Sequence, residues 1–364
     1  MHHRPMWLVF ALVGPVGLGG CDDEGHGREI RGDLVATDPI TVVDGRQFDE
    51  IFAVHDTLEL EEPRGIVTVA PFVSLDSGGG FLVADGAEHQ VRVYGPQGKL
   101  SEVFGEGTDR VDSIKSPERA LRLPNGDLLV VNLAGPLTLL PARHEEPTRF
   151  IPRFLRTARH AEVLNDREVL MVGSDSNPVS ATLFRLDLTS GEYSEGFFAP
   201  PAHLDKWVTT FMSSVRTARR GNRIAAVHML SDTLVIFDLS GREQKRIPIP
   251  LDPFRVPQGP LPDDVASAAE RYAWTAQFTL VMDLFWISDN ELIVQWAKAL
   301  DNGIDADVGI LQMDTTGVRA WAIAPSPKLV AVRGEEFFFR NPRNHDPNRW
   351  WVATRRTVPE EPSS

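Results

Sequence analysis

The stretch Gly78–Gly105 reads GGGFLVADGAEHQVRVYGPQGKLSEVFG, and its pattern decides the fold. Two short apolar runs, Phe81–Asp85 and Gln90–Tyr94, are followed by a Gly-Pro-Gln-Gly turn and by a third run, Leu100–Gly105. Short runs that are bounded by Gly, Pro and Asp are typical of antiparallel strands joined by tight turns. The stretch therefore predicts three consecutive strands of one small sheet.

The same order of strands and turns returns five times along the chain. The later copies are Leu121–Val131, Val169–Gly191, Ile224–Gly241, Leu292–Gly317 and Phe337–Thr354. Repeats of about 40 to 50 residues, each with three or four short strands, are the signature of β-propeller blades. We therefore predict an all-β, six-bladed propeller over residues 48–357. The strand Ile51–Leu60 precedes the first copy and is expected to complete the last blade, which runs out of sequence.

The first copy resembles an NHL repeat, the blade unit of a class of six-bladed propellers. The resemblance is carried by Phe81–Asp85, His89, Val91–Tyr94, Gly98–Lys99 and Phe104–Gly105, whereas Glu88 and Gln90 depart from the pattern. It implies a packed or hydrogen-bonded role for His89 rather than metal binding. It does not imply a function, because propellers serve as binders, lyases, lactonases and hydrolases.

One insertion interrupts the repeats between the fourth and fifth blades. Its first part, Pro248–Pro262, is rich in proline and must be extended or turning. Its second part, Asp263–Trp274, has acidic residues in its first turn and predicts a short helix. A lid over the channel, a partner-docking element and a plug on a blade edge all fit this insertion.

The N-terminus has the layout of an export signal. Arg4 precedes the apolar run Met6–Gly20, which is too short to span a membrane as a helix of about 20 residues. The run ends in Leu-Gly-Gly-Cys at Cys21, the single cysteine of the chain. This ending resembles the lipobox of bacterial lipoproteins, which implies lipidation of Cys21 and a place in the bacterial cell envelope. An ordinary secretory signal that is cleaved nearby is the alternative.

Four segments follow from these patterns. They are a lipoprotein signal peptide (1–20), the lipidated cysteine with its tether (21–47), the propeller (48–357) and a C-terminal tail (358–364). The formal net charge of −14 disfavours binding to nucleic acid or to anionic lipid. We therefore expect contact with the membrane through the lipid anchor only, and a monomer.

The propeller geometry also predicts a ring of residues at the mouth of the central channel. We take the residue just before the innermost strand of each blade, with Ile66–Val69 as that strand in blade one. The resulting ring is Arg64, Arg119, His160, Ser214, Asp283 and Lys328. It is mostly cationic on an acidic protein, which favours binding of a small anionic group through the forked donors of Arg64 and Arg119. The alternative is a set of polar residues that solvate a water-filled channel.

These observations predict a binding or scaffolding module for an envelope protein or a small anionic ligand. No catalytic residues and no cofactor are predicted. The alternative is a propeller enzyme of the lactonase or lyase type with a metal on the axis. Such a metal would need carboxylate, Asn or His ligands that converge at the centre, and a ring of Arg and Lys counts against it.

Overall fold

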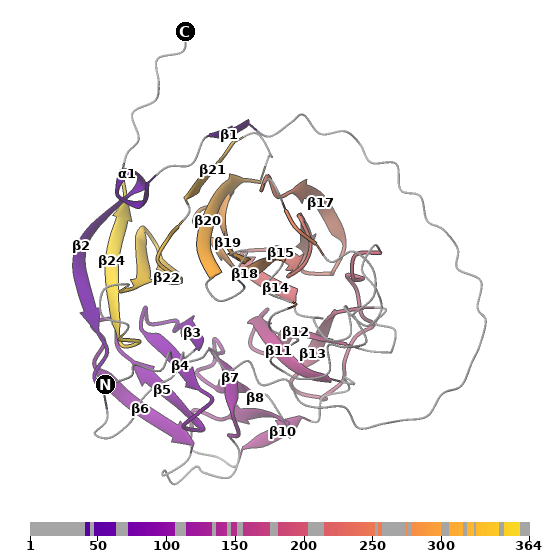
Figure 1. The fold of residues 1–364 in the computed structure, drawn as a ribbon. Coiled ribbons are helices and arrows are strands. Elements are labelled where there is room, and N and C mark those ends of the chain that lie inside the picture. Colours follow the sequence, from indigo (N-terminus) through magenta and orange to yellow (C-terminus); the bar gives the residue numbers. More distant parts are fainter. Residues whose placement is uncertain are drawn as a thin grey trace, which may run out of the picture.

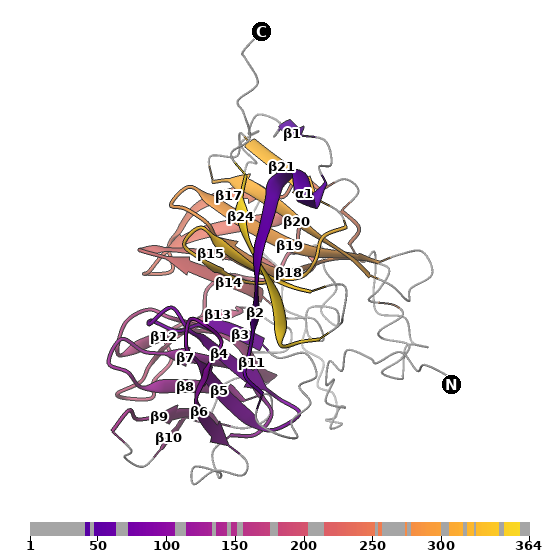
Figure 2. The same ribbon diagram turned by 90° about the vertical axis from the view of Figure 1, so that its left-hand side faces the viewer.

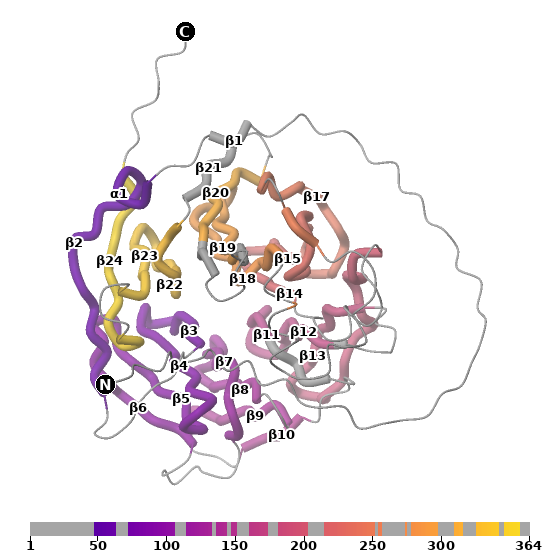
Figure 3. Tube along the Cα trace, viewed as in Figure 1, coloured from indigo at the N-terminus to yellow at the C-terminus, as the bar shows by residue number. Residues whose placement is uncertain are grey.

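The computed structural model is a six-bladed β-propeller, in which six small antiparallel sheets surround a central axis (Figure 1). Figure 3 follows the chain through the blades in sequence order. The structure describes residues 41–43, 47–62, 72–105, 114–132, 136–143, 147–150, 156–174, 181–202, 215–251, 254–256, 274, 278–299, 306–315, 319–323, 325–341 and 346–356. The predicted fold class is confirmed.

Each blade is a meander that begins at the axis and ends at the rim. Blade one is β3 (Phe72–Leu75), β4 (Phe81–Asp85), β5 (Gln90–Tyr94) and β6 (Leu100–Gly105); blade two is β7 (Pro117–Arg122), β8 (Leu128–Asn132), β9 (Leu137–Leu140) and β10 (Thr148–Phe150); blade three is β11 (Arg156–Val163), β12 (Glu168–Ser174) and β13 (Leu183–Asp187). Blade four is β14 (Val215–Arg220), β15 (Arg223–His228), β16 (Thr233–Asp238) and β17 (Glu243–Pro248); blade five is β18 (Thr279–Trp286), β19 (Glu291–Ala299), β20 (Ala306–Asp314) and β21 (Arg319–Ile323); blade six is β22 (Leu329–Arg333), β23 (Glu336–Arg340) and β24 (Arg349–Arg355).

The three strands that the opening stretch predicts are β4, β5 and β6, with the predicted bounds. The innermost strand of blade one was placed wrongly. It is β3, and the segment Ile66–Val69 lies outside the described residues. β3 is only four residues long, and in it the apolar residues Phe72 and Leu75 are exposed while the polar Ser74 is buried, so its sequence lacks the pattern of a half-buried strand.

The ring is closed by the N-terminal strand β2 (Phe52–Glu59), as predicted. It follows the single-turn helix α1 (Phe48–Ile51) and pairs antiparallel with β24, so that Thr57 lies opposite Trp351 (Figures 1 and 2). Beyond the strand, the amide of Leu60 donates to the carbonyl oxygen of Asn348 at 2.9 Å. A further short strand, β1 (Thr41–Val43), pairs parallel with β21 and adds to blade five. The N-terminal part of the chain therefore contributes strands to two blades.

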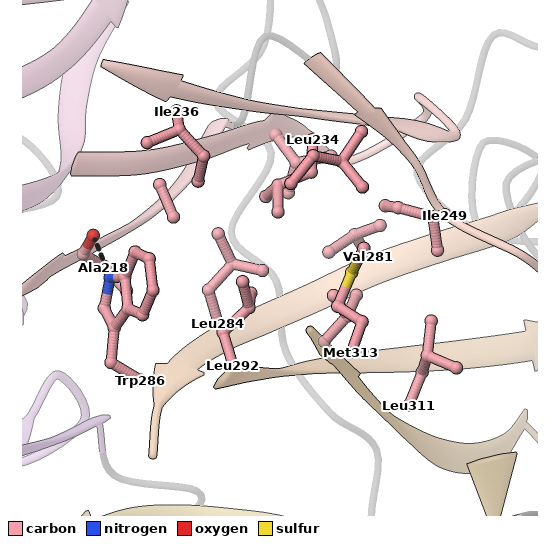
Figure 4. Close-up of a cluster of buried hydrophobic side chains, with 14 of the residues drawn as sticks. Ala218, Leu234, Ile236, Ile249, Val281, Leu284, Trp286, Leu292, Leu311 and Met313 are labelled. Atoms are coloured by element: carbon pink, nitrogen blue, oxygen red, sulfur yellow. Dashed lines mark hydrogen bonds between the residues drawn. The ribbon is translucent and has the colours of Figure 1, made fainter. Parts of the chain in front are cut away.

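A cluster of buried apolar side chains fills each of the six junctions between neighbouring blades. The cluster between blades four and five includes Leu234, Val281 and Met313, and in it the indole nitrogen of Trp286 donates to the carbonyl oxygen of Ala218 at 3.0 Å (Figure 4). A small blade sheet has two apolar faces, and it can bury both only between two neighbours. The closed ring supplies those neighbours for all six blades.

Several predicted segments fall outside the described residues. They are Cys21, the tether as far as residue 40, the tail, and all of the predicted helix Asp263–Trp274 except Trp274. The insertion itself lies where it was predicted, between β17 and β18. In the described part of the chain, no helix has both the length and the apolar character needed to cross a membrane.

Candidate functional site on the propeller axis

The innermost strands β3, β7, β11, β14, β18 and β22 surround the axis (Figure 1). Four of them, β7, β11, β18 and β22, have a register shift in their pairing, and in the first three a polar residue of the predicted ring follows the shift. These residues are Arg119 in β7, His160 in β11 and Asp283 in β18. Such irregularities bend a strand and re-aim the side chains that follow them. The inner strands are therefore irregular where the polar residues of the ring stand.

Four side chains from blades two, three and four form a closed hydrogen-bond cycle. The guanidinium of Arg119 donates through Nη1 to Nε2 of His160 and through Nη2 to Oε1 of Glu162 at 3.3 Å. Nδ1 of His160 lies 2.9 Å from Oγ1 of Thr217. The hydroxyl of Thr217 in turn donates to Oε1 of Glu162 at 3.4 Å. Oε1 of Glu162 thus accepts hydrogen bonds from both Arg119 and Thr217.

The directions of these bonds fix the protonation state of His160. Arginine has donors only, so Nε2 of His160 must be the acceptor of the Arg119 bond. In the neutral ring the proton then lies on Nδ1, which donates to Thr217. Burial lowers the pKa of His160 well below its usual value, and the charges of Arg119 and Arg216 lower it further. His160 is therefore a neutral, oriented imidazole.

In this cycle, the negative charge of the Glu162 carboxylate is the charge that its surroundings offset least. Its side chain is 14% exposed. Burial raises the pKa of Glu162 to about 7, and the charge of Asp283 adds to the shift, while Arg119 and the Thr217 hydroxyl oppose it. Both hydrogen bonds to Oε1 are longer than is usual for a charge-assisted bond. The carboxyl group is accordingly poised to gain or lose a proton near neutral pH.

A second group of charges continues around the axis into blades five and six. Burial lowers the pKa of Lys328 to about 8, the cations Arg340 and Arg216 lower it too, and Asp283 opposes them. The backbone amide of Arg340 donates to the carbonyl oxygen of Lys328 at 2.8 Å, which holds the two residues side by side. Burial also lowers the pKa of Arg340. We call the two groups together the axial cluster: Arg119, His160, Glu162, Arg216, Thr217, Asp283, Lys328 and Arg340.

The axial cluster includes four of the six residues of the predicted ring, namely Arg119, His160, Asp283 and Lys328. Arg64 and Ser214 lie outside the described residues. The other four members, Glu162, Arg216, Thr217 and Arg340, were not predicted from the sequence. Glu162 follows His160 by two positions in β11, so the alternation of a strand places both on one face, and this signal could have found it. No comparable signal points to Arg340, because it stands at the end of β23 rather than on an innermost strand.

Among the described residues, no three His, Cys, Asp or Glu side chains lie in positions to hold a metal ion. His89 has the hydrogen-bonded role that was expected, because its Nδ1 accepts from the backbone amide of Ser116 at 2.8 Å and links blade one to blade two.

Two surface hollows lie away from the axis, and their linings are rich in acidic residues. One, of about 440 Å³, lies where the ring closes and is lined by residues that include Glu59, Glu61, Glu62 and Asp346. The other, of about 500 Å³, lies beside Asp166 and Asp187 in blade three. Neither contains a member of the axial cluster. We place the candidate site at the axis because buried titratable groups from several blades converge there.

Comparisons with known proteins support the fold. No protein-family model matches the chain, and no curated protein matches it in sequence. The fold is similar to a solved structure of a DUF4221 family member from Bacteroides vulgatus, with 10% sequence identity and a TM-score of 0.57 over 84% of this chain and 97% of that one. It is also similar to a Bacteroides fragilis protein described as exported, with 11% identity and a TM-score of 0.57 over 87% and 98% of the two chains. At this level of identity the similarity establishes the architecture alone.

Proposed function

We propose that this protein is a lipid-anchored β-propeller of the bacterial cell envelope that binds a small anionic ligand at the axial cluster. The observation that carries the proposal is the excess of cations there. Among the described residues of the axial cluster, the cations Arg119, Arg216, Lys328 and Arg340 outnumber the carboxylates Glu162 and Asp283, on a chain whose overall formal charge is −14.

Burial of these cations gives the anion its binding energy. Lys328 loses solvation and lies near two arginines, so its ammonium group is held at a cost that a bound anion would offset. Nε of Arg119 is also buried and has no hydrogen-bond partner among the described residues. An oxyanion beside it would satisfy that donor, and charge-assisted bonds of this kind are the strong ones.

Asp283 narrows the chemical class of the ligand. A carboxylate beside a cationic site repels a simple anion but accepts a hydrogen bond from a hydroxyl group. A ligand with one oxyanion and a neighbouring hydroxyl would use both kinds of group. We therefore favour a hydroxy acid or a sugar acid over a simple carboxylate.

The test is titration calorimetry at pH 7.5 with glycolate, and with acetate as the ligand that lacks the hydroxyl. We expect Lys328→Gln to weaken binding of glycolate by about tenfold to a hundredfold, the usual value of one hydrogen bond to a charged group. Lys99→Gln is the matched control, because Lys99 is exposed on the turn of blade one. Equal affinity of the Lys328→Gln variant and the parent protein would contradict the proposal.

The envelope location is supported by the Leu-Gly-Gly-Cys ending at Cys21 and by the exported Bacteroides fragilis protein of the same architecture. Cell fractionation tests it. The parent chain should be recovered with membranes, and Cys21→Ser should move it to the soluble envelope fraction. Membrane recovery of both forms, together with no incorporation of labelled palmitate into the parent chain, would exclude lipid anchoring at Cys21.

The lactonase or lyase alternative has no comparable support. It requires oxygen or imidazole ligands that converge on a metal. In the described blades the single imidazole of the axial cluster is already occupied by Arg119 and Thr217.

A further inference from the structure

We propose that the axial site binds its anion together with one proton, and that Glu162 holds this proton. The inference rests on the proposed function and adds the regulation of that site. It predicts that the site takes up its ligand more tightly in mildly acidic surroundings.

The geometry leaves Glu162 as the proton acceptor of the cycle. His160 has no free position, because Nε2 accepts from Arg119 and Nδ1 donates to Thr217. A proton on Nε2 would also point at a permanent cation. Glu162, in contrast, uses Oε1 for both Arg119 and Thr217, and no hydrogen bond to Oε2 is present among the described residues. A proton can therefore be added at Oε2 without breaking the cycle.

The groups that face Glu162 from the surrounding strands all act in known directions. They are Arg119 from β7, His160 from its own strand β11, Thr217 and Arg219 from β14, and Asp283 from β18. Arg119 and Arg219 favour the ionised carboxylate, while burial and Asp283 favour the neutral acid. A bound anion would add a further negative charge nearby. It would shift this balance towards the neutral acid.

Protonation of Glu162 also changes which hydrogen-bond donors of Arg119 are available to a ligand. In the ionised state the two η nitrogens of Arg119 are engaged, one by His160 and one by Glu162. Once Glu162 is neutral, the hydrogen bond from Arg119 to Oε1 is no longer an ion pair, so it holds this donor less strongly against a bound anion. Arg119 can then turn a donor towards the ligand. The cation that the sequence singled out for anion binding thus becomes available through the proton on Glu162.

The experiment measures proton uptake directly. Sulfate is the probe, since its charge is constant between pH 5.5 and 7.5. Calorimetric titrations in buffers of different ionisation enthalpy give the number of protons that accompany binding. At pH 7.5, pKa values of about 7 for Glu162 and about 8 for Lys328 give uptake of up to about 0.75 and 0.25 protons respectively. At pH 5.5 both values should be close to zero.

Two variants separate these contributions. Lys328→Arg keeps the cation and should retain uptake of about 0.75 protons at pH 7.5, as expected for Glu162 alone. Glu162→Gln mimics the neutral acid, so it should bind sulfate at pH 7.5 about as tightly as at pH 5.5, with uptake of no more than about 0.25 protons from Lys328.

Each outcome decides a different point. Sulfate binding in which Lys328→Arg takes up no protons would overturn the inference and leave the proposed function standing. Failure of the parent protein to bind sulfate at either pH would overturn both the inference and the proposed function for this anion. If Glu162→Gln does not fold, the comparison of the parent protein with Lys328→Arg decides the question by itself.

Discussion

At the scale of single residues, blade one has an ion pair with almost no contact with water. Nη2 of Arg92 lies 3.3 Å from Oδ2 of Asp85, and the two side chains are 0% and 1% exposed. Asp85 also accepts from the amides of Ala87 and Glu88 in the turn after β4. Removing one partner of such a pair leaves the other charge buried without its counter-ion.

We therefore expect Asp85→Asn to lower the free energy of unfolding by about 3 kcal/mol, the usual loss when one partner of a buried ion pair is removed. Urea denaturation measures it. Asp187→Asn is the matched control, because Oδ1 of Asp187 makes the same kind of turn bonds, to Thr189 and Ser190, and no buried arginine ion pair to it is seen in the described blades. Equal losses for the two variants would assign the effect to the turn and not to the ion pair.

The raised pKa of Glu162 predicts that the free energy of unfolding depends on pH. Its pKa is about 7 in the folded protein, against a usual value of 4.5, so the folded state binds more protons between these values. Stability from this group is full below pH 4.5 and is lost as the pH rises to 7. The loss should reach about 3 kcal/mol at 1.36 kcal/mol per pKa unit.

The comparison with Glu162→Gln isolates this effect, because the opposite contribution of His160 is present in both proteins. Unfolding curves at pH 4.5, 6 and 8 should show the parent protein losing stability relative to the variant up to pH 7, with little change beyond. A constant difference between the two proteins would show that Glu162 titrates normally.

The sequence predicted the members of the axial cluster only in part, for a physical reason. One residue per blade was taken at the start of each inner strand, which assumes strands in regular register. Arg119, His160 and Asp283 each follow a register shift instead. A shift of this kind depends on pairing with the next strand, which a single segment does not reveal. Glu162 was missed for a different reason: only one residue per inner strand was taken, although the alternation of β11 places Glu162 on the same face as His160.

At the scale of elements, the tight turn of blade one also holds the closing strand. Gly98 has φ +78°, and a Cβ there would lie 2.4 Å from the carbonyl oxygen of Glu59 in β2. Its own carbonyl oxygen accepts from the amide of Glu61 at 2.9 Å. Gly221 has φ +57° in the β14–β15 turn, with nothing within 4 Å of the same position.

These two glycines make a matched test. Substitution of either glycine by Ala places a Cβ at a positive φ, which lowers the free energy of unfolding by the order of 1 kcal/mol. Only Gly98→Ala also displaces the backbone of β2, so we expect it to be the more destabilising by at least another 1 kcal/mol, since a clash in a packed region typically costs about 1 to 3 kcal/mol. Thermal unfolding of both variants gives the comparison. Similar losses would mean that the turn does not lock the closing strand.

The elements themselves were largely predictable from the sequence. The bounds of β4, β5 and β6 follow from alternating apolar runs and glycine turns, which are local signals. The closing role of β2 followed from counting, since the last blade lacked a strand and the N-terminus had a spare one. The pairing of β1 with β21 was not predicted. Three residues that pair with a strand near the other end of the chain leave no local signal.

At the scale of the whole molecule, the ring depends on one junction, the pairing of β2 with β24 in blade six. Blade six needs β2, from the opposite end of the chain, as its fourth strand, whereas blade five has four consecutive strands of its own to which β1 is added. Phe52 is at the centre of this closure, with its ring 5.0 Å from the rings of both Phe337 and Phe339 and 1% of its surface exposed. It belongs to the apolar cluster between blades five and six.

Phe52→Ala should accordingly lower the free energy of unfolding by about 3 to 5 kcal/mol, as is usual for a buried phenylalanine. The loss should also be localised, because β2 can detach while the other blades keep their neighbours. Hydrogen exchange tests this: amides of β24 should exchange about a hundredfold faster than in the parent protein, while amides of β12 in blade three change less. Val54→Ala is the control on the same strand. Because Val54 is 44% exposed, this substitution should leave the exchange rates of the β24 and β12 amides unchanged. Equal acceleration in β24 and β12 would mean instead that the propeller opens only as a whole, with closure no weaker than any other junction.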